Sequence, residues 1–319
     1  MSASVAPAVP VSVSAGVARP RFLILLRGEL FKIAHLRITW VMSAIFTLLV
    51  VGSQLLLVSG QNTQSDLQSN PLGSFYNLME GDLSIVRIFS GTFLLILTAH
   101  VIGLEYQQGT IRILLGRGVG RLQLLGAKVL AVLLAGLGII AFEMLIEALF
   151  GFGLVAAFGG NHHPARVLGA EYWMDVRFYV LCVLINAVAT LLLGVAASVA
   201  GRSLAFGLAV GLSWFFVDNL ATLPLSIMAR FTHSDLWLKL SGLLLGPVLN
   251  RLPDEIAPPY HVTVAGPHGP TTITQAVSGF GILPLVTVPG SHALLVILVY
   301  SLVFATIAVV LTRRREVLE

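Results

Sequence analysis

Long apolar segments separated by short polar ones dominate the sequence. A helix rises about 1.5 Å per residue and the hydrocarbon core of a bilayer is about 30 Å thick, so roughly 20 mostly apolar residues are needed to cross it. Six segments meet this requirement: Trp40 to Gly60, Ser84 to Leu104, Val129 to Phe158, Val176 to Ala200, Leu204 to Met228, and His292 to Leu311. The pattern predicts six transmembrane helices, because these runs lack the alternation of a barrel strand.

Composition supports the same class. Of the 319 residues, 56% are apolar and only 11% are charged, and the mean hydropathy is +0.92. A soluble domain carries roughly a quarter charged residues. We therefore expect an all-α integral membrane protein, and soluble, collagen-like and disordered classes are excluded.

The distribution of positive charge predicts how the chain is oriented. Most of the 19 Lys and Arg residues precede the first span, lie between the second and third spans, or follow the last one. The predicted first outer loop, Gln61 to Asp82, contains neither residue type. The positive-inside rule then places both termini in the cytoplasm of a protein of the plasma or inner membrane.

Three of the regions outside the spans have a recognisable pattern of their own. Residues 1–20 are small and Pro-containing and predict a disordered cytoplasmic tail, whereas residues 21–39 have the spacing of an amphipathic helix at the inner membrane surface. A basic flank that only orients the first span is the alternative. Residues 229–291 are too long for a plain connection, and we expect a re-entrant or interfacial hairpin over Leu236 to Leu249 followed by an irregular external loop.

The connection between the second and third spans, residues 105–128, carries the most specific pattern. It reads E-Y-Q-Q-G-T-I-R-I-L-L followed by G-R-G-V-G-R-L-Q-L-L-G-A-K. Thr110 is predicted to cap a short helix whose apolar face holds Ile111, Leu114 and Leu115, with Arg112 on another side. A short helix held between two spans is a good docking surface for a soluble partner.

These residues resemble the permease subunits of ABC-2 type transporters. The matching pattern is an acidic residue, a Gly-Thr pair, an Arg, two leucines, and then an Arg and a Lys before the next span: Glu105, Gly109, Thr110, Arg112, Leu114, Leu115, Arg121 and Lys128. The basic finish at Arg313 to Glu316 is also similar to the family. Gly118 departs from it, because a Pro is common in relatives, as does Gly120, which replaces a Ser-like cap.

The resemblance implies a six-span transmembrane domain over residues 40–319 that forms half of an export pathway. It implies that residues 105–128 couple the spans to a separate ATP-binding subunit, present in two copies, which binds ATP and Mg²⁺. The second half of the pathway is another copy of this chain or a sister permease, surrounded by lipid. The chain lacks a G-x-x-x-x-G-K-[ST] phosphate loop, so we expect no cofactor and no catalytic residue in it, and nothing indicates nucleic-acid binding.

Three acidic residues lie within the predicted spans: Glu143, Glu147 and Asp218. An ionisable group in lipid costs a few kcal/mol, at least about 2.5, so these residues should face the protein interior or a water-filled cavity. They are candidate pathway residues that contact a cationic or polar substrate or relay protons. The alternative is that they cap helices, bond to the outer hairpin, or pair with arginines near the outer surface.

A different class of function is also compatible with the sequence. The six spans would then anchor a larger complex or transmit force to it without moving a solute, and the docking segment would look the same. A membrane-embedded enzyme is disfavoured, because the acidic residues have no nucleophile or metal partner at motif spacing. The external histidines match no metal motif, and no metal site is predicted.

Overall fold

The computed structural model describes residues 22–59, 71–158, 168–257, 260–266, 269–275 and 288–314. The predicted tail over residues 1–20 lies outside these ranges. Six helical stretches in the described part are long and apolar enough to cross a bilayer. All six predicted spans are therefore confirmed, and the chain is a multi-pass membrane protein.

The helices of the first half begin with α1 (Phe22–His35) and the first span, α2 (Arg37–Val58). The second span is one continuous helical stretch made of α4 (Pro71–Thr98), the π-helical turn η1 (Ala99–Gly103) and α5 (Leu104–Gln107). The short helix α6 (Thr110–Gly116) then leads to the third span, α7 (Arg121–Phe158).

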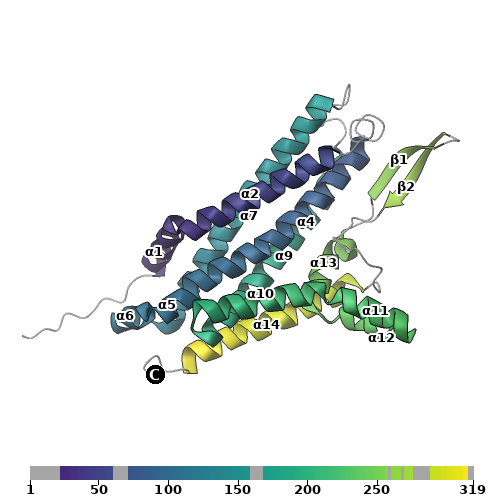
Figure 1. Ribbon diagram of the computed structural model, residues 1–319. Coiled ribbons are helices and arrows are strands. Elements are labelled where there is room, and N and C mark those ends of the chain that lie inside the picture. The colour runs from purple at the N-terminus through teal and green to yellow at the C-terminus, as the bar shows by residue number, and fades with distance from the viewer. Residues whose placement is uncertain are drawn as a thin grey trace, which may run out of the picture.

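The second half contains the fourth span, α9 (Ala170–Gly201), and a fifth formed by α10 (Leu204–Leu220) with α11 (Thr222–Thr232). Two shorter helices follow, α12 (Leu236–Ser241) and α13 (Leu245–Ile256). A β-hairpin of β1 (Tyr260–Gly266) and β2 (Gly269–Gln275) precedes the sixth span, α14 (Gly290–Arg314). Figure 1 shows this hairpin and α11 to α13 at one end of the bundle, with α1, α5 and α6 at the other.

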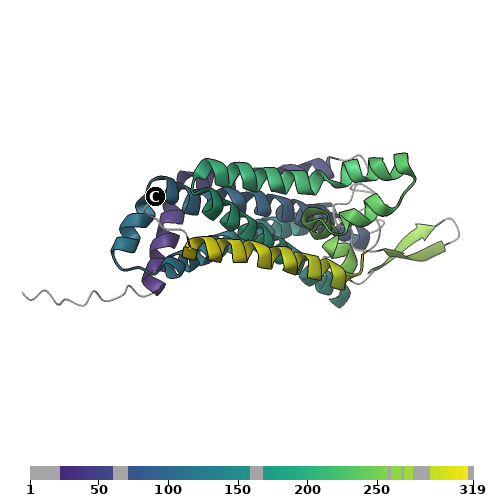
Figure 2. The same ribbon diagram turned by 90° about the horizontal axis from the view of Figure 1, so that it is seen from below.

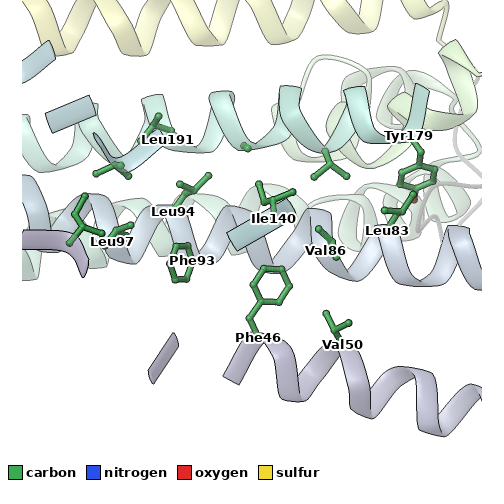
Figure 3. Packing of buried hydrophobic residues seen from close by; sticks show 14 of the residues in the cluster. Phe46, Val50, Leu83, Val86, Phe93, Leu94, Leu97, Ile140, Tyr179 and Leu191 are labelled. Atoms are coloured by element: carbon green, nitrogen blue, oxygen red, sulfur yellow. The ribbon is translucent and has the colours of Figure 1, made fainter. Parts of the chain in front are cut away.

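The second and fourth spans form the centre of the bundle. In each, 67% of the most apolar window is buried, against 17–28% in the other four spans. Phe46 and Val50 of α2 face α4 in Figure 3, where Val86 and Phe93 lie between α2 and α9. The remaining spans surround this core and leave apolar side chains exposed along α2, α10 and α14, as a lipid-facing surface requires. Figure 2 shows α14 lying along one side of the bundle.

Two expectations about connections are wrong in the described part. The predicted first outer loop, Gln61 to Asp82, is already helical from Pro71 onward, because Pro is favoured at the first helical position and apolar residues then recur with helical spacing. The predicted irregular loop contains the antiparallel hairpin, in which Tyr260 pairs with Gln275 and Gly266 with Gly269. Both strands are rich in β-branched residues, which favour extended backbone.

The segment between the fifth and sixth spans contains the expected break. Gly242 ends α12, and α13 begins three residues later with an almost fully buried first turn. Pro253 supplies no N–H to the carbonyl of Leu249 one turn earlier, and the buried Arg87 of α4 donates to that carbonyl instead, at 2.7 Å. The re-entrant character of this pair of helices stays a prediction.

Candidate functional site

Four charged side chains join three helices at the end of the bundle that carries α6. Lys128 Nζ of α7 lies 2.9 Å from Glu29 Oε2 of α1 and 2.7 Å from Glu105 Oε2 of α5. Lys32 Nζ of α1 lies 2.9 Å from Glu29 Oε1 and 2.8 Å from Glu105 Oε1. Each carboxylate thus contacts both ammonium groups, and the four residues form a closed arrangement that we call the charge ring.

The charge ring has a buried side and an exposed side. Lys128 is 1% exposed and Glu29 4%, whereas the side chain of Lys32 is 46% exposed. Partial burial lowers the pKa of Lys32, but hydrogen bonds to Glu105 and Glu29 outweigh it and raise the pKa above its ordinary value. A buried charge that lost its partner would be strongly unfavourable, so the ring holds α1, α5 and α7 together as a unit.

A tight corner connects the ring to α6. Gly109 precedes α6 with φ +71°, a left-handed conformation that a residue with a side chain rarely adopts. Thr110 makes no capping hydrogen bond, so the prediction that it caps this helix is wrong: Gly109 is the residue before the helix, and Thr110 is already its first residue.

The predicted faces of α6 are confirmed. Ile111 is buried with Val119 and Leu124 in a small apolar cluster, against which Leu114 and Leu115 pack. Arg112 is exposed, and Ile113 is 60% exposed. The helix therefore rests on the bundle with one face and presents a basic and apolar face away from it.

Further contacts close to the ring join the fifth span to the second and the sixth span to the third. The side chain of Gln107 accepts a hydrogen bond from the backbone N–H of Leu204 at the start of α10, at 3.2 Å. Gly103 lies so close to the turn before α10 that a Cβ there would be 2.8 Å from Ser203 O. Arg121, at the start of α7, donates to the carbonyl of Arg313 in the last turn of α14, at 3.4 Å.

The eight residues predicted to couple the spans to a partner thus lie together, but in two layers. Glu105, Arg121 and Lys128 contact other elements of the bundle, and Lys128 is buried beneath the surface. Arg112 lies on the exposed face, Leu114 and Leu115 are half-buried, and Gly109 and Thr110 form the corner. The exposed face of α6 can therefore contact a partner directly. The charge ring can act only indirectly, through the helices that it joins.

The three candidate pathway residues do not form one group. Asp218, near the end of α10, accepts a hydrogen bond from the backbone N–H of Gly246 and so holds the first turn of α13. This is the contact with the outer hairpin that the sequence left as an alternative. Glu143 and Glu147 lie on α7 instead, about 22 and 28 Å along the helix from Lys128.

Glu143 and Glu147 are both buried at the end of the bundle away from the ring. Glu143 is 0% exposed and accepts a hydrogen bond from Thr47 at 2.7 Å. Glu147 is 7% exposed and lines a cavity of about 220 Å³ between α4, α7 and α9. Asp82 of α4 lines the same cavity, 4% exposed, and accepts a hydrogen bond from Gln54.

Sequence reasoning missed three important residues. Glu29 and Lys32 were assigned to an interfacial helix without a contact to the docking segment, and Asp82 was assigned to an outer loop. The signal for Asp82 was the apolar periodicity at Phe75, Met79 and Leu83, which extends the second span to its N-terminal side. No sequence signal pairs Glu29 with Lys128, because that contact depends on how α1 packs against α7.

The described residues contain no group of three or more His, Cys, Asp or Glu side chains arranged to hold a metal ion. In a comparison with known families, residues 25–218, more than half of the chain, match the family described as "ABC-2 family transporter protein". No curated protein matches the chain. The match begins within α1 and extends through the charge ring, α6 and the cavity to the fifth span. This chain therefore belongs to the ABC-2 family of transporter proteins and is a membrane component of an ABC transporter.

Proposed function

We propose that this protein is the permease subunit of an ATP-driven exporter and that a separate ATP-binding subunit docks on α6. The family match supports a permease role. The exposed Arg112 and Ile113 support docking, because a charged and an apolar group side by side at a projecting helix are typical of interface anchors. ATP and Mg²⁺ are assigned to the docked subunit, and the transport pathway to this chain.

The charge ring is the observation that carries the proposal. A force applied to α6 reaches α5 through the corner at Gly109, and α5 is joined by Glu105 to Lys128 of α7 and Lys32 of α1. In addition, Gln107 of α5 contacts α10, and Arg121 of α7 contacts α14. Movement of one short helix would therefore displace several spans together, as alternating access in an exporter requires.

Orientation and assembly complete the proposal. The ring, α6 and the basic end of α14 lie in the cytoplasm, in agreement with the positive-inside rule. Two copies of the ATP-binding subunit serve two permeases, which are two copies of this chain or this chain and a sister permease.

Co-purification tests the docking. The tagged chain is purified from its native membrane, and ATP hydrolysis in the eluate is measured for the natural protein and for the double variant Arg112→Asp, Ile113→Asp. We expect the activity that elutes with the variant to fall by about tenfold, which is typical when anchor residues of an interface are lost. Arg177→Asp, an exposed charge reversal at the far end of α9, is the matched control and should retain the activity. Absence of ATP hydrolysis from the natural eluate, or its retention in the double variant, would contradict the proposal.

Cysteine labelling tests the orientation. Cys182 is the single cysteine and is buried, so Cys182→Ser gives a suitable background. Gly116→Cys introduces a thiol on α6 at an exposed position where a Cβ meets no atom within 4 Å. A membrane-impermeant maleimide should label it only from the cytoplasmic side, whereas Glu171→Cys at the other end should react only from outside. Labelling of Gly116→Cys from outside would overturn the account.

A further inference from the structure

The cavity between α4, α7 and α9 is lined by two acidic side chains and has room for a small molecule. Its volume is about 220 Å³, and Asp82 and Glu147 both contribute to its lining. Gly151, one turn beyond Glu147 on α7, lines it as well, and a Cβ there would meet no atom within 4 Å. The space is therefore present without any displacement of the backbone.

The acidic residues of the cavity have unused hydrogen-bonding capacity. Only 7% of Glu147 is exposed, and its Oε1 has no hydrogen-bond partner. Asp82 Oδ1 is unpartnered too, since the contact with Gln54 uses Oδ2. Among the described residues, no Lys, Arg or His pairs with either carboxylate. A buried carboxylate without a partner is strongly unfavourable. A positively charged group bound in the cavity would therefore stabilise the carboxylates of Asp82 and Glu147.

Aromatic rings supply the rest of the lining. Phe152, Phe75, Tyr172 and Trp173 form a continuous series, with successive ring centroids 6.4, 6.1 and 5.6 Å apart. The faces of such rings attract cations, and their area binds apolar groups. Carboxylates beside an aromatic wall are thus complementary to a cation that carries an apolar body.

We infer that this cavity binds an amphipathic organic cation, an ammonium group attached to an apolar body. The ammonium lies against Asp82 and Glu147, and the apolar part lies along the aromatic series. A metal ion fits less well, because the described residues contain no cluster of three metal-ligating side chains, and hard cations require several oxygen ligands. The inference does not depend on the docking of an ATP-binding subunit, since binding is a property of the permease alone.

Binding of a matched pair of probes tests the charge requirement. The purified full chain in an uncharged maltoside detergent is titrated with benzyltrimethylammonium by calorimetry, and separately with neopentylbenzene, which has the same shape without the charge. We expect the cation to bind at least about tenfold more tightly than its neutral counterpart, a difference in the range of desolvated cation–π and charge contacts. Equal affinity for the two probes, or no binding of the cation, would overturn the inference.

Two variants locate the site. Glu147→Gln removes the charge at constant shape and should weaken binding of the cation by about tenfold, with little effect on neopentylbenzene. Glu171→Gln removes an exposed charge from the first turn of α9 and should leave both affinities unchanged. Gly151→Phe fills the cavity without altering any charge and should abolish binding of both probes. Unchanged binding of the cation in Glu147→Gln and Gly151→Phe, each eluting as a folded protein in size-exclusion chromatography, would place the probe elsewhere.

The ammonium group has two sources, a lipid headgroup or a soluble amphiphile, and lipid composition separates them. The cation is titrated into the protein in nanodiscs of phosphatidylglycerol, with and without phosphatidylethanolamine. Competition by phosphatidylethanolamine identifies the lipid ammonium as the natural occupant. Undiminished binding of the probe identifies a soluble amphipathic cation.

Discussion

The two ends of the bundle differ in whether their buried carboxyl groups have cationic partners. In the charge ring, two carboxylates alternate with two ammonium groups, and each carboxylate contacts both. At the cavity, Asp82 and Glu147 are as deeply buried, but no described cationic side chain pairs with them. Carboxylates paired with ammonium groups hold helices together, whereas carboxyl groups without a cationic partner form a site that favours an incoming cation.

The largest effect is expected from opening the ring. Lys128→Met keeps a side chain of similar length but leaves Glu29 and Glu105 without their buried partner, which should lower the free energy of unfolding by about 3–5 kcal/mol. Equilibrium unfolding in mixed maltoside and dodecyl sulfate micelles measures this change. The double variant Lys128→Met, Glu105→Gln should recover part of the loss, because one stranded charge is removed. A double variant no more stable than the single one would show that the ring is not what Lys128 stabilises.

A smaller change in the free energy of unfolding is expected when a glycine is replaced by alanine. The change should differ between the closely packed region near the ring and the open space of the cavity. Gly103→Ala brings a Cβ within 2.8 Å of Ser203 O and should destabilise the protein by about 1–3 kcal/mol. Gly151→Ala meets no neighbouring atom and should be neutral or stabilising by up to about 1 kcal/mol, because Ala has the higher helix propensity. The same unfolding assay applies to both. Similar changes in the free energy of unfolding for the two variants would contradict the difference in packing between the two ends of the bundle.

Neutralising a cavity carboxylate should have the opposite sign to opening the ring. Glu147→Gln removes a buried carboxyl group that no described cationic side chain pairs with, and it is expected to raise the free energy of unfolding by about 1 kcal/mol, as is common where a functional site lowers stability. Glu171→Gln, which is exposed, should change it by less than about 0.5 kcal/mol. A marked loss of stability in Glu147→Gln would mean that this carboxylate has a partner that holds the fold.

The smallest effect is expected at the exposed side of the ring. Lys32→Met should cost less than about 1 kcal/mol, because solvent screens a side chain that is 46% exposed. The raised pKa of Lys32 means that its contribution is fully present below the unfolded value of 10.5 and is lost only as the pH rises through the higher folded value. The difference in stability between the natural protein and this variant should therefore be constant from pH 6 to pH 9. A difference that disappears within this range would show that Lys32 is not held by its two carboxylates.

The faces of the docking helix were predictable, and its partners inside the bundle were not. Spacing alone placed Ile111 on the buried face of α6 and Arg112 on the exposed one, because neighbours on a helix follow a fixed rotation. Spacing did not reveal that Gly109 would replace Thr110 before the helix, since a left-handed residue depends on the direction the chain must take next. The contact of Lys128 with Glu29 joins residues 99 positions apart, beyond the reach of any local pattern.

For the candidate pathway residues too, the sequence predicted part of the result and the tertiary structure the rest. Glu143, Glu147 and Asp218 were recognised because a carboxylate within an apolar run is costly wherever it lies. Their environments then diverged: Asp218 holds the backbone of α13, whereas Glu147 lines a cavity together with Asp82. Asp82 was missed because a helix that continues beyond its apolar segment is not distinguished from a loop by hydropathy.

The sequence by itself determined that this is a membrane protein with six spans and that the segment after the second span is its most specific feature. Hydropathy over about 20 residues suffices for this, because lipid excludes unpaired backbone groups and leaves the helix as the form that each run adopts. Only the tertiary structure decided which charges meet. Helix packing brings Glu29 to Lys128 and Asp82 to the cavity of Glu147, and the energy of a buried charge depends on its neighbours in space and not on those along the chain.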